Sequence, residues 1–363
     1  MFKKAKINQC TITLTRNCNL RCSFCYAKKT DYITNEFIEF DYVKKMVDFC
    51  DEAKAKYVIL TGGEPMLYPQ LPEIIRYIKS KKSKLIATIA TNGTVLDNFD
   101  YCKELIDFGL DYVDVSLKGW DNVSFSNVTG CNCFSKQLQA IRNLSTLGVD
   151  FTCSMVITPA NVNSYCDAIE KAANNGASKF SFTFVIDNES CEIRDAQYLE
   201  KNNPFALVDS FLSHADRLET ITKGEWWIEY SFPMCVYTDS QLKALEGRLA
   251  APCQIYYRNG VTFDAKMNLI PCSMNIETTM GQFGTEFITY KEFKKLSRNG
   301  VYKSSIDELN KLPSERCKSC KYLKKCLGGC TFFWKHCTFE AFNKFKEDWL
   351  SFDEIQLPEK SQA

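Results

Sequence analysis

Cys18-Asn19-Leu20-Arg21-Cys22-Ser23-Phe24-Cys25 is the run of this 363-residue chain that says most about its fold. It has the spacing CxxxCxxC and directly follows an apolar, strand-like stretch from Ile7 to Thr15. Three thiolates at this spacing can bind three irons of a cubane iron–sulfur cluster and leave the fourth iron to a small molecule. An open metal position is typical of a catalytic site. The alternatives are half of a zinc site or a chance pattern in a cysteine-rich chain.

The composition favours a soluble cytoplasmic protein. With a net charge of +1, the chain has no overall field that would attract nucleic acid or an anionic membrane. The N-terminus lacks an apolar signal core, and no apolar run approaches membrane-spanning length. Nineteen cysteines in a reducing compartment are better explained as metal ligands than as disulfides.

Histidine chemistry is not expected. The chain has two histidines, His214 and His336, and neither has an acid–base partner in its local sequence. This pattern argues against imidazole-centred hydrolysis. We expect His336 to be a surface residue beside Cys337.

After the cysteine loop, β-rich runs alternate with amphipathic stretches. The expected strands are 7–15, 57–60, 84–90, 112–117, 151–157 and 179–185, and the expected helices are 41–55, 71–81, 96–108, 134–147 and 163–175. Six strands alternating with helices predict an α/β fold of parallel βα units. The right-handed crossover rule curls these units into a partial (β/α)6 TIM-like barrel. We expect a loop at 187–203 and a helix at 204–218.

The alternation ends near Trp226, and cysteines dominate the sequence from there. We therefore expect a barrel domain at residues 1–225 and a small Cys-rich α+β domain at 226–363. Trp226 and Trp227 are expected in the core at this junction, because large aromatic side chains are usually buried.

Polar and glycine-rich segments follow successive strands. They are the cysteine loop, Gly62-Gly63-Glu64-Pro65, Thr91-Asn92-Gly93 and Ser116-Leu117-Lys118. In such barrels the chemistry lies on loops at the carboxyl ends of the strands. The four segments therefore predict one site.

The three cysteines, with Phe24 beside them and Gly62-Gly63-Glu64-Pro65 one strand later, resemble the radical S-adenosylmethionine (radical SAM) superfamily over about residues 7–187. The resemblance implies a [4Fe-4S] cluster on Cys18, Cys22 and Cys25, whose open iron is chelated by SAM. It also implies reductive cleavage of SAM to a 5′-deoxyadenosyl radical, which removes a hydrogen atom from an unreactive C–H bond. The implied SAM-contacting residues are Phe24, Gly62, Gly63, Glu64, Pro65, Asn92, Ser116, Lys118 and Ile157.

Each of these segments is expected to contact a particular part of SAM. The Gly62–Pro65 segment is expected to bind the methionine amino group. Lys118 is expected at the methionine carboxylate and Ser116 at the ribose. The Val156-Ile157 strand end is expected beside the adenine.

The C-terminal run CxxCxxxxxCxxxC resembles the SPASM domain, a module that carries auxiliary iron–sulfur clusters. The resemblance implies two auxiliary [4Fe-4S] clusters. The outer one would use Cys317, Cys320, Cys326 and Cys337, and the inner one Cys253, Cys272 and Cys330. Met267 departs from the family, which usually has glycine at this position. Two zinc ribbons are the structural alternative, since CxxC is also a zinc spacing.

These seven cysteines are one short of two fully ligated clusters. The eighth ligand is either Cys235 or no residue at all, and an open inner iron could bind a substrate thiolate. Cys131 and Cys133 lie near the expected active face, where a thiol could donate a hydrogen atom to a substrate radical. The other cysteines, expected as small core residues, are Cys10, Cys50, Cys102, Cys153, Cys166 and Cys191.

Members that combine both modules mostly modify peptides or proteins. The leading hypothesis is a maturase for a ribosomally made peptide, which forms a thioether or carbon–carbon crosslink or inverts a stereocentre. The expected partners are a peptide or protein substrate and a flavodoxin- or ferredoxin-type electron donor, which could dock on Lys321–Lys325. Because the first strand begins near residue 7, we expect no room for an N-terminal leader-binding domain.

Three other functions are considered. One is an anaerobic sulfatase-maturing enzyme that forms formylglycine; Ser273 counts against it, because that family has an aspartate there. Another is the dehydrogenation of a small alcohol or sugar. The last is a non-catalytic iron–sulfur electron carrier, which would not need a Gly62–Pro65 segment.

Overall fold

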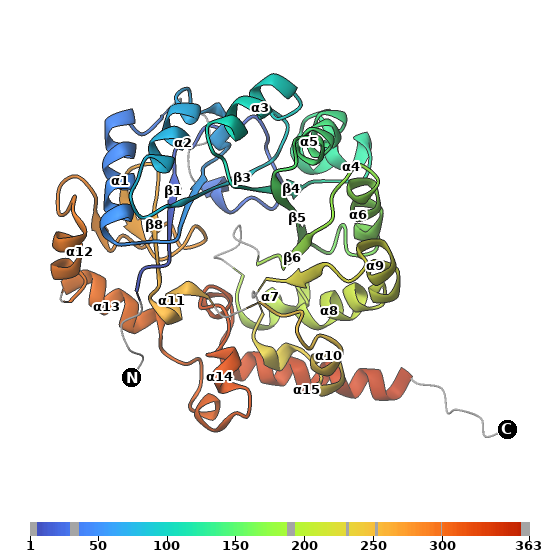
Figure 1. The fold of residues 1–363 in the computed structure, drawn as a ribbon. Coiled ribbons are helices and arrows are strands. Elements are labelled where there is room, and N and C mark those ends of the chain that lie inside the picture. The colour runs from blue at the N-terminus through green and yellow to red at the C-terminus, as the bar shows by residue number, and fades with distance from the viewer. Residues whose placement is uncertain are drawn as a thin grey trace.

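The structure is a computed structural model that describes residues 6–29, 36–186, 193–229, 232–250, 253–298 and 300–356. One mixed sheet lies inside an arc of helices (Figure 1). Its strands are β1 Gln9–Thr13, β2 Tyr57–Thr61, β3 Ile86–Thr91, β4 Tyr112–Leu117, β5 Asp150–Ile157, β6 Phe180–Phe184, β7 Trp226–Ile228, β8 Gly260–Phe263, β9 Asn268–Ile270 and β10 Gly281–Gln282.

The helices before residue 225 are α1 Phe40–Glu52, α2 Leu71–Lys79, α3 Phe99–Asp107, α4 Asn122–Thr129, α5 Phe134–Leu147, α6 Tyr165–Ala173, α7 Asp195–Lys201, α8 Pro204–Leu212 and α9 Ala215–Thr222. Those after it are α10 Asp239–Ala244, α11 Gln254–Tyr257, α12 Tyr290–Leu296, α13 Gly300–Leu309, α14 Leu323–Cys326 and α15 Phe339–Gln356. Within the ranges above, no helix combines the length and apolar character that crossing a bilayer requires.

Strands β1 to β7 are parallel and adjacent in chain order, so the predicted partial barrel is confirmed. Side chains alternate along each strand. On β4, Val113 and Val115 are fully buried under the helices, while Asp114 and Ser116 line the inside of the barrel. This alternation supplies polar groups to the interior at the carboxyl end of the sheet.

Two predictions about the segment after β6 are wrong. Residues 195–201 form helix α7 rather than a loop, while 187–192 lie outside the described residues. The single helix expected at 204–218 is two helices, α8 and α9, which break at Ser213 and His214. The Tyr165 hydroxyl donates a hydrogen bond to the Phe211 carbonyl (3.0 Å) at the end of α8. That carbonyl therefore already has a partner where a continuous helix would use it.

The sheet continues past residue 225 at both of its edges. β7 pairs with β6, and β8 pairs in parallel with β1, so Cys10 lies opposite Val261. β9 and β10 extend the β8 edge in antiparallel fashion. Trp226, expected in the core, is buried. The C-terminal segment therefore completes the sheet instead of standing apart from it.

Candidate functional site

The carboxyl ends of β1 to β6 surround a cavity of about 280 Å³. All three cysteines of the CxxxCxxC loop line it, together with Gly62 and Gly63. The other lining residues are Leu20, Phe24, Tyr26, Thr61, Ala90, Thr91, Asn92, Asp114, Ser116, Lys118, Ser154, Val156, Thr183, Phe184, Val185, Ile186 and Met274. Sequence segments up to about 250 residues apart thus converge on one site, as the strand-end rule predicts.

The cysteine loop is held by the end of α4. The Arg21 amide donates to the Thr129 carbonyl and the Ser23 amide to the Val128 carbonyl, both at 2.8 Å. The last carbonyls of a helix lack partners within the helix, so they are free to take these bonds. Helix α4, inserted between β4 and α5, therefore anchors the loop that carries the thiols.

Gly62 and Gly63 press directly against the chain that leads into the loop. The Gly63 amide donates to the Thr15 carbonyl (2.8 Å). A Cβ on Gly63 would lie 2.4 Å from the Asn17 carbonyl oxygen, and one on Gly62 would lie 2.7 Å from that of Thr15. Both obstacles are backbone atoms, so only glycine allows this approach.

Glu64 stabilises the site through buried hydrogen bonds. Its side chain is fully buried and accepts hydrogen bonds from the Met66 amide (3.1 Å), the Thr91 hydroxyl (2.6 Å) and the Asn92 amide (2.8 Å). Burial raises the pKa of Glu64, and these three donors oppose the rise. Neither Glu64 nor Pro65 lines the cavity, and the hydrogen bonds of Glu64 instead join the end of β2 to the end of β3.

Four of the expected SAM contacts line the cavity wall beside the glycine pair: Phe24, Asn92, Ser116 and Lys118. The Lys118 ammonium donates to the Ser116 hydroxyl (2.7 Å) and lies 5.0 Å from the centre of the Phe24 ring. The Lys118 ammonium is therefore available to bind the carboxylate of a ligand.

Like Glu64 and Pro65, Ile157 does not line the cavity. Ile157 is fully buried on the helix-facing side of β5, and its neighbour Val156 lines the cavity instead. The cause is the alternation of side chains along a strand.

Sequence reasoning missed four polar cavity residues, Tyr26, Asp114, Ser154 and Thr183. Burial raises the pKa of Asp114 to about 6, and a hydrogen bond with Ser154 opposes the rise. The Asp114 Oδ1 atom is buried and has no hydrogen-bond partner in the described part of the chain. The alternating pattern of β4 was the available signal, since a carboxylate beside Val113 and Val115 must face inward.

The cavity residues fit an iron–sulfur cluster by their donor chemistry. Burial raises the pKa of Cys18 to about 11 and also raises that of Cys22, so these thiols are protonated without a metal. Among the described residues, no group of His, Cys, Asp or Glu converges on a single-ion site. A cubane spreads its ligands, one thiolate per iron, so a cysteine set that is too open for a single ion still fits it.

Two further cysteine sets lie in the C-terminal segment. Cys253, Cys272 and Cys330 lie near one another: the pKa of Cys272 is raised to about 12, by burial first and then by the neighbouring Cys330 and Cys253. Met274, two residues after Cys272, lines the barrel cavity. We call these three cysteines the inner set, because they adjoin the barrel site.

The second set surrounds a separate cavity of about 200 Å³ that Cys317, Cys320 and Cys326 line. We call it the outer cavity. The fourth cysteine of its wall is Cys235, whereas Cys337, expected there, does not line it. The expectation that His336 is a surface residue is wrong. Its side chain is 2% exposed and stacks on the Tyr198 ring, with the ring centres 4.5 Å apart. Tyr198 belongs to α7, a helix that the sequence did not predict.

The remaining cysteines have other roles. Cys131 and Cys133 are paired with each other in the structure, and hydrogen donation would require both as free thiols. Cys10, Cys50, Cys102, Cys153 and Cys166 are buried, as core residues should be. Cys191 lies outside the described residues.

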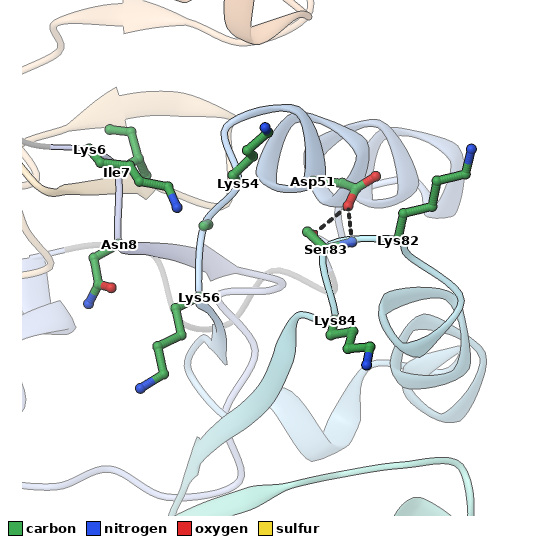
Figure 2. A pocket seen from close by; sticks show the side chains of 10 residues that line it. Lys6, Ile7, Asn8, Asp51, Lys54, Lys56, Lys82, Ser83 and Lys84 are labelled. Carbon is green, nitrogen blue, oxygen red and sulfur yellow. Dashed lines mark hydrogen bonds between the residues drawn. The ribbon is translucent and has the colours of Figure 1, made fainter.

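A larger cavity, about 720 Å³, lies at the opposite, amino ends of β1 to β3 (Figure 2). The side chains that line it are mainly those of lysines. The one carboxylate in the lining, Asp51, accepts a hydrogen bond from the Ser83 amide (2.9 Å). No cysteine lines it, and catalytic groups in such barrels lie at the other end. We therefore place the reaction in the smaller cavity.

Residues 12–173 match the sequence profile of the Radical SAM superfamily. A protein named "Probable GTP 3′,8-cyclase" from Methanococcus maripaludis is 30% identical over 158 residues, 44% of this chain and 50% of the relative. The Fe-coproporphyrin III synthase of Methanosarcina barkeri is 31% identical over 163 residues, 44% of this chain and 40% of the relative. The chain thus spans about half the length of these curated relatives.

Solved structures match over nearly the whole chain. Native anSMEcpe with bound AdoMet has a TM-score of 0.67 at 18% identity, and the match covers 96% of this chain and 100% of that one. Streptococcus suis SuiB bound to precursor peptide SuiA has a TM-score of 0.67 at 15% identity, and the match covers 90% of this chain and 72% of that one. At these identities the likeness concerns the fold. The profile match, together with the cysteine–glycine site, shows that residues 12–173 form a radical SAM domain.

Proposed function

We propose that the chain is a radical SAM enzyme that modifies a peptide, most simply as a maturase of a ribosomally made peptide. The observation that carries the proposal is the convergence of three cysteines, the glycine pair and Lys118 on one cavity that Met274 links to the inner cysteine set. Cys18, Cys22 and Cys25 would hold a [4Fe-4S] cluster. When bound, that cluster supplies the electron that cleaves SAM to a 5′-deoxyadenosyl radical.

The protein's own residues bind and orient the ligands. The Gly62–Gly63 segment would bind the methionine amino group, and Lys118 would neutralise the methionine carboxylate. Glu64 holds the strand ends still, and Phe24 and Val156 keep water from the reacting atoms. Asp114 and Ser154 lie deeper in the barrel, where they are placed to bind polar groups of a substrate.

A peptide substrate is favoured over a small molecule by the C-terminal half. The curated relatives named as GTP 3′,8-cyclases match between 35% and 60% of this chain. The solved structures that match 90% or more of it include SuiB with its precursor peptide and anSMEcpe with a Cp18Cys peptide. That half would be a SPASM domain at residues 226–363, with auxiliary clusters on the inner set and at the outer cavity.

We further propose that a flavodoxin- or ferredoxin-type donor docks beside the outer cavity, in the cytoplasm. Cys320 is exposed, and so are Lys324 and Lys325 nearby, so a cationic surface adjoins the thiols. Acidic one-electron carriers are attracted to such a surface, and their association slows as salt screens it.

The test is anaerobic reconstitution with iron and sulfide, followed by SAM, a low-potential reductant and candidate substrates. The candidates are peptides encoded by short neighbouring reading frames, a cysteine peptide of the sulfatase type, and GTP. We expect 5′-deoxyadenosine, with a mass loss of about 2 Da in a crosslinked or oxidised peptide, or one solvent deuterium in an epimerised peptide.

Cys22→Ala should abolish 5′-deoxyadenosine formation, whereas Cys102→Ala, in a buried thiol remote from the cavity, should retain it. Absence of 5′-deoxyadenosine under every condition contradicts the proposal. Turnover of GTP alone would replace the peptide with a nucleotide substrate.

A further inference from the structure

Four cysteine side chains, rather than three, line the outer cavity. Three belong to the run Cys317–Cys326, and the fourth, Cys235, comes from the segment after β7. Trp334 and Phe339 complete much of the wall, and the whole space measures about 200 Å³. A thiolate set of four is the complement that a closed [4Fe-4S] cluster needs.

Contacts on both sides hold Cys235 in this wall. The Met234 amide donates a hydrogen bond to the Cys326 sulfur (3.4 Å), and the Cys235 carbonyl accepts one from Lys346 of α15 (2.6 Å). Gly329 lets the two segments approach, since a Cβ there would lie 2.6 Å from the Cβ of Pro233. The position of Cys235 is therefore built by the fold around it.

Cys337 lies near Cys235 but does not line this cavity. It is 4% exposed and belongs to the hydrophobic core. The residues on either side of it are tied to α7: the Asp195 amide donates to the His336 carbonyl (2.9 Å), and the Thr338 amide donates to the Asp195 carboxylate (2.7 Å). These bonds fix the backbone of Cys337 beside α7, outside the cavity wall.

From this arrangement we infer that Cys235 is the fourth ligand of the outer cluster and that Cys337 is a core residue. The inference rests on the proposed auxiliary clusters. If Cys235 binds the outer cluster, it cannot also complete the inner set, which then has three thiolates. The inner cluster then has one iron open beside the barrel cavity. Each thiol releases its proton to solvent as it binds an iron of the cluster, and reconstitution supplies the iron and sulfide.

The experiment compares Cys235→Ser with Cys337→Ser after anaerobic reconstitution, by iron content and by electron paramagnetic resonance. The wild type should hold about twelve irons, four per cluster. Cys235→Ser should lose up to about four irons or show a [3Fe–4S] signal, whereas Cys337→Ser should match the wild type. Cys320→Ser serves as the positive control, and circular dichroism verifies that each variant is folded.

If Cys235→Ser fails to fold, Cys235→His provides the second variant, because imidazole is also a ligand. It should retain the iron and shift the resonance of one cluster. Loss of iron in Cys337→Ser, or full iron with an unchanged spectrum in Cys235→Ser, overturns the ligand assignment and leaves the proposed function intact. A wild type that holds only about four irons overturns the auxiliary clusters themselves.

Discussion

At the scale of single residues, Asp114 is the cavity group whose charge is most sensitive to pH near neutrality. Its raised pKa of about 6 arises from burial first, with Glu229 adding to the rise and Ser154 and Lys118 opposing it. The carboxyl group is therefore neutral below about pH 6 and negative above it. Since its Oδ1 atom has no partner among the described residues, the ionised form is available to accept a hydrogen bond from a substrate.

We predict that substrate-dependent 5′-deoxyadenosine formation rises between about pH 5.5 and 7.5 with an inflection near 6. The inflection should disappear in Asp114→Asn, whose amide does not titrate. Ser154→Ala should move it to higher pH, because the lost hydrogen bond is one of the interactions that lower the pKa. The measurement is the initial rate against pH at saturating SAM. An unchanged inflection in Asp114→Asn would assign the titration to another group.

At the scale of elements, helix α5 joins the ends of two strands that form the site. Gln137 is 1% exposed, and its Nε2 donates to the carbonyls of Asn92 (2.7 Å) and Ser116 (3.0 Å). Both acceptors belong to segments that line the cavity. One buried amide on a helix therefore sets the spacing between β3 and β4.

Gln137→Leu should lower the free energy of unfolding by about 1–3 kcal/mol, because it leaves two buried carbonyls without a donor. It should also weaken SAM binding, since Asn92 and Ser116 lose their common anchor. Gln139→Leu is the matched control: the Gln139 side chain bonds only to Asn143 and Arg142 of the same helix. The checks are denaturant unfolding and SAM titration by calorimetry. Equal effects of both substitutions would contradict the role of Gln137.

The helices and strands also show which parts of the fold can be predicted from the sequence. Apolar residues that repeat every two or every 3.6 positions predicted β1 to β6 and most of the helices between them. The buried face of each of these elements can be recognised from its own residues. The strand-end rule then brought Cys18, Gly63 and Ser116 together. The patterns did not predict α4 or α7. They also missed the break between α8 and α9 and the pairing of β8 with β1, which depend on contacts distant in sequence. The family resemblance placed Cys337 in the outer set, and no spacing rule encodes the approach of Cys235 across more than 80 residues.

At the scale of the whole molecule, the two halves share one core. Phe49 of α1 contacts four phenylalanine rings of the C-terminal segment, with ring centres 5.6–6.3 Å apart. The four rings are those of Phe263, Phe283, Phe287 and Phe293. Together with the pairing of β8 with β1, this cluster couples the barrel to the segment that carries the inner and outer cysteine sets.

We predict that the chain unfolds in a single thermal transition and that Phe263→Ala lowers the whole transition. Phe263 is fully buried on β8, so its removal should cost about 3–5 kcal/mol and lower the midpoint by on the order of 5 °C. Phe99→Ala, at a ring that is 42% exposed, should change the midpoint little. The measurement is differential scanning calorimetry of the reconstituted protein at one fixed scan rate. Two separate transitions, with only one of them shifted by Phe263→Ala, would mean that the barrel is stable without its C-terminal partner. A single shifted transition would mean that damage near the auxiliary sites also reaches the SAM cavity, because β1 leads into the cysteine loop and is held on one side by β8.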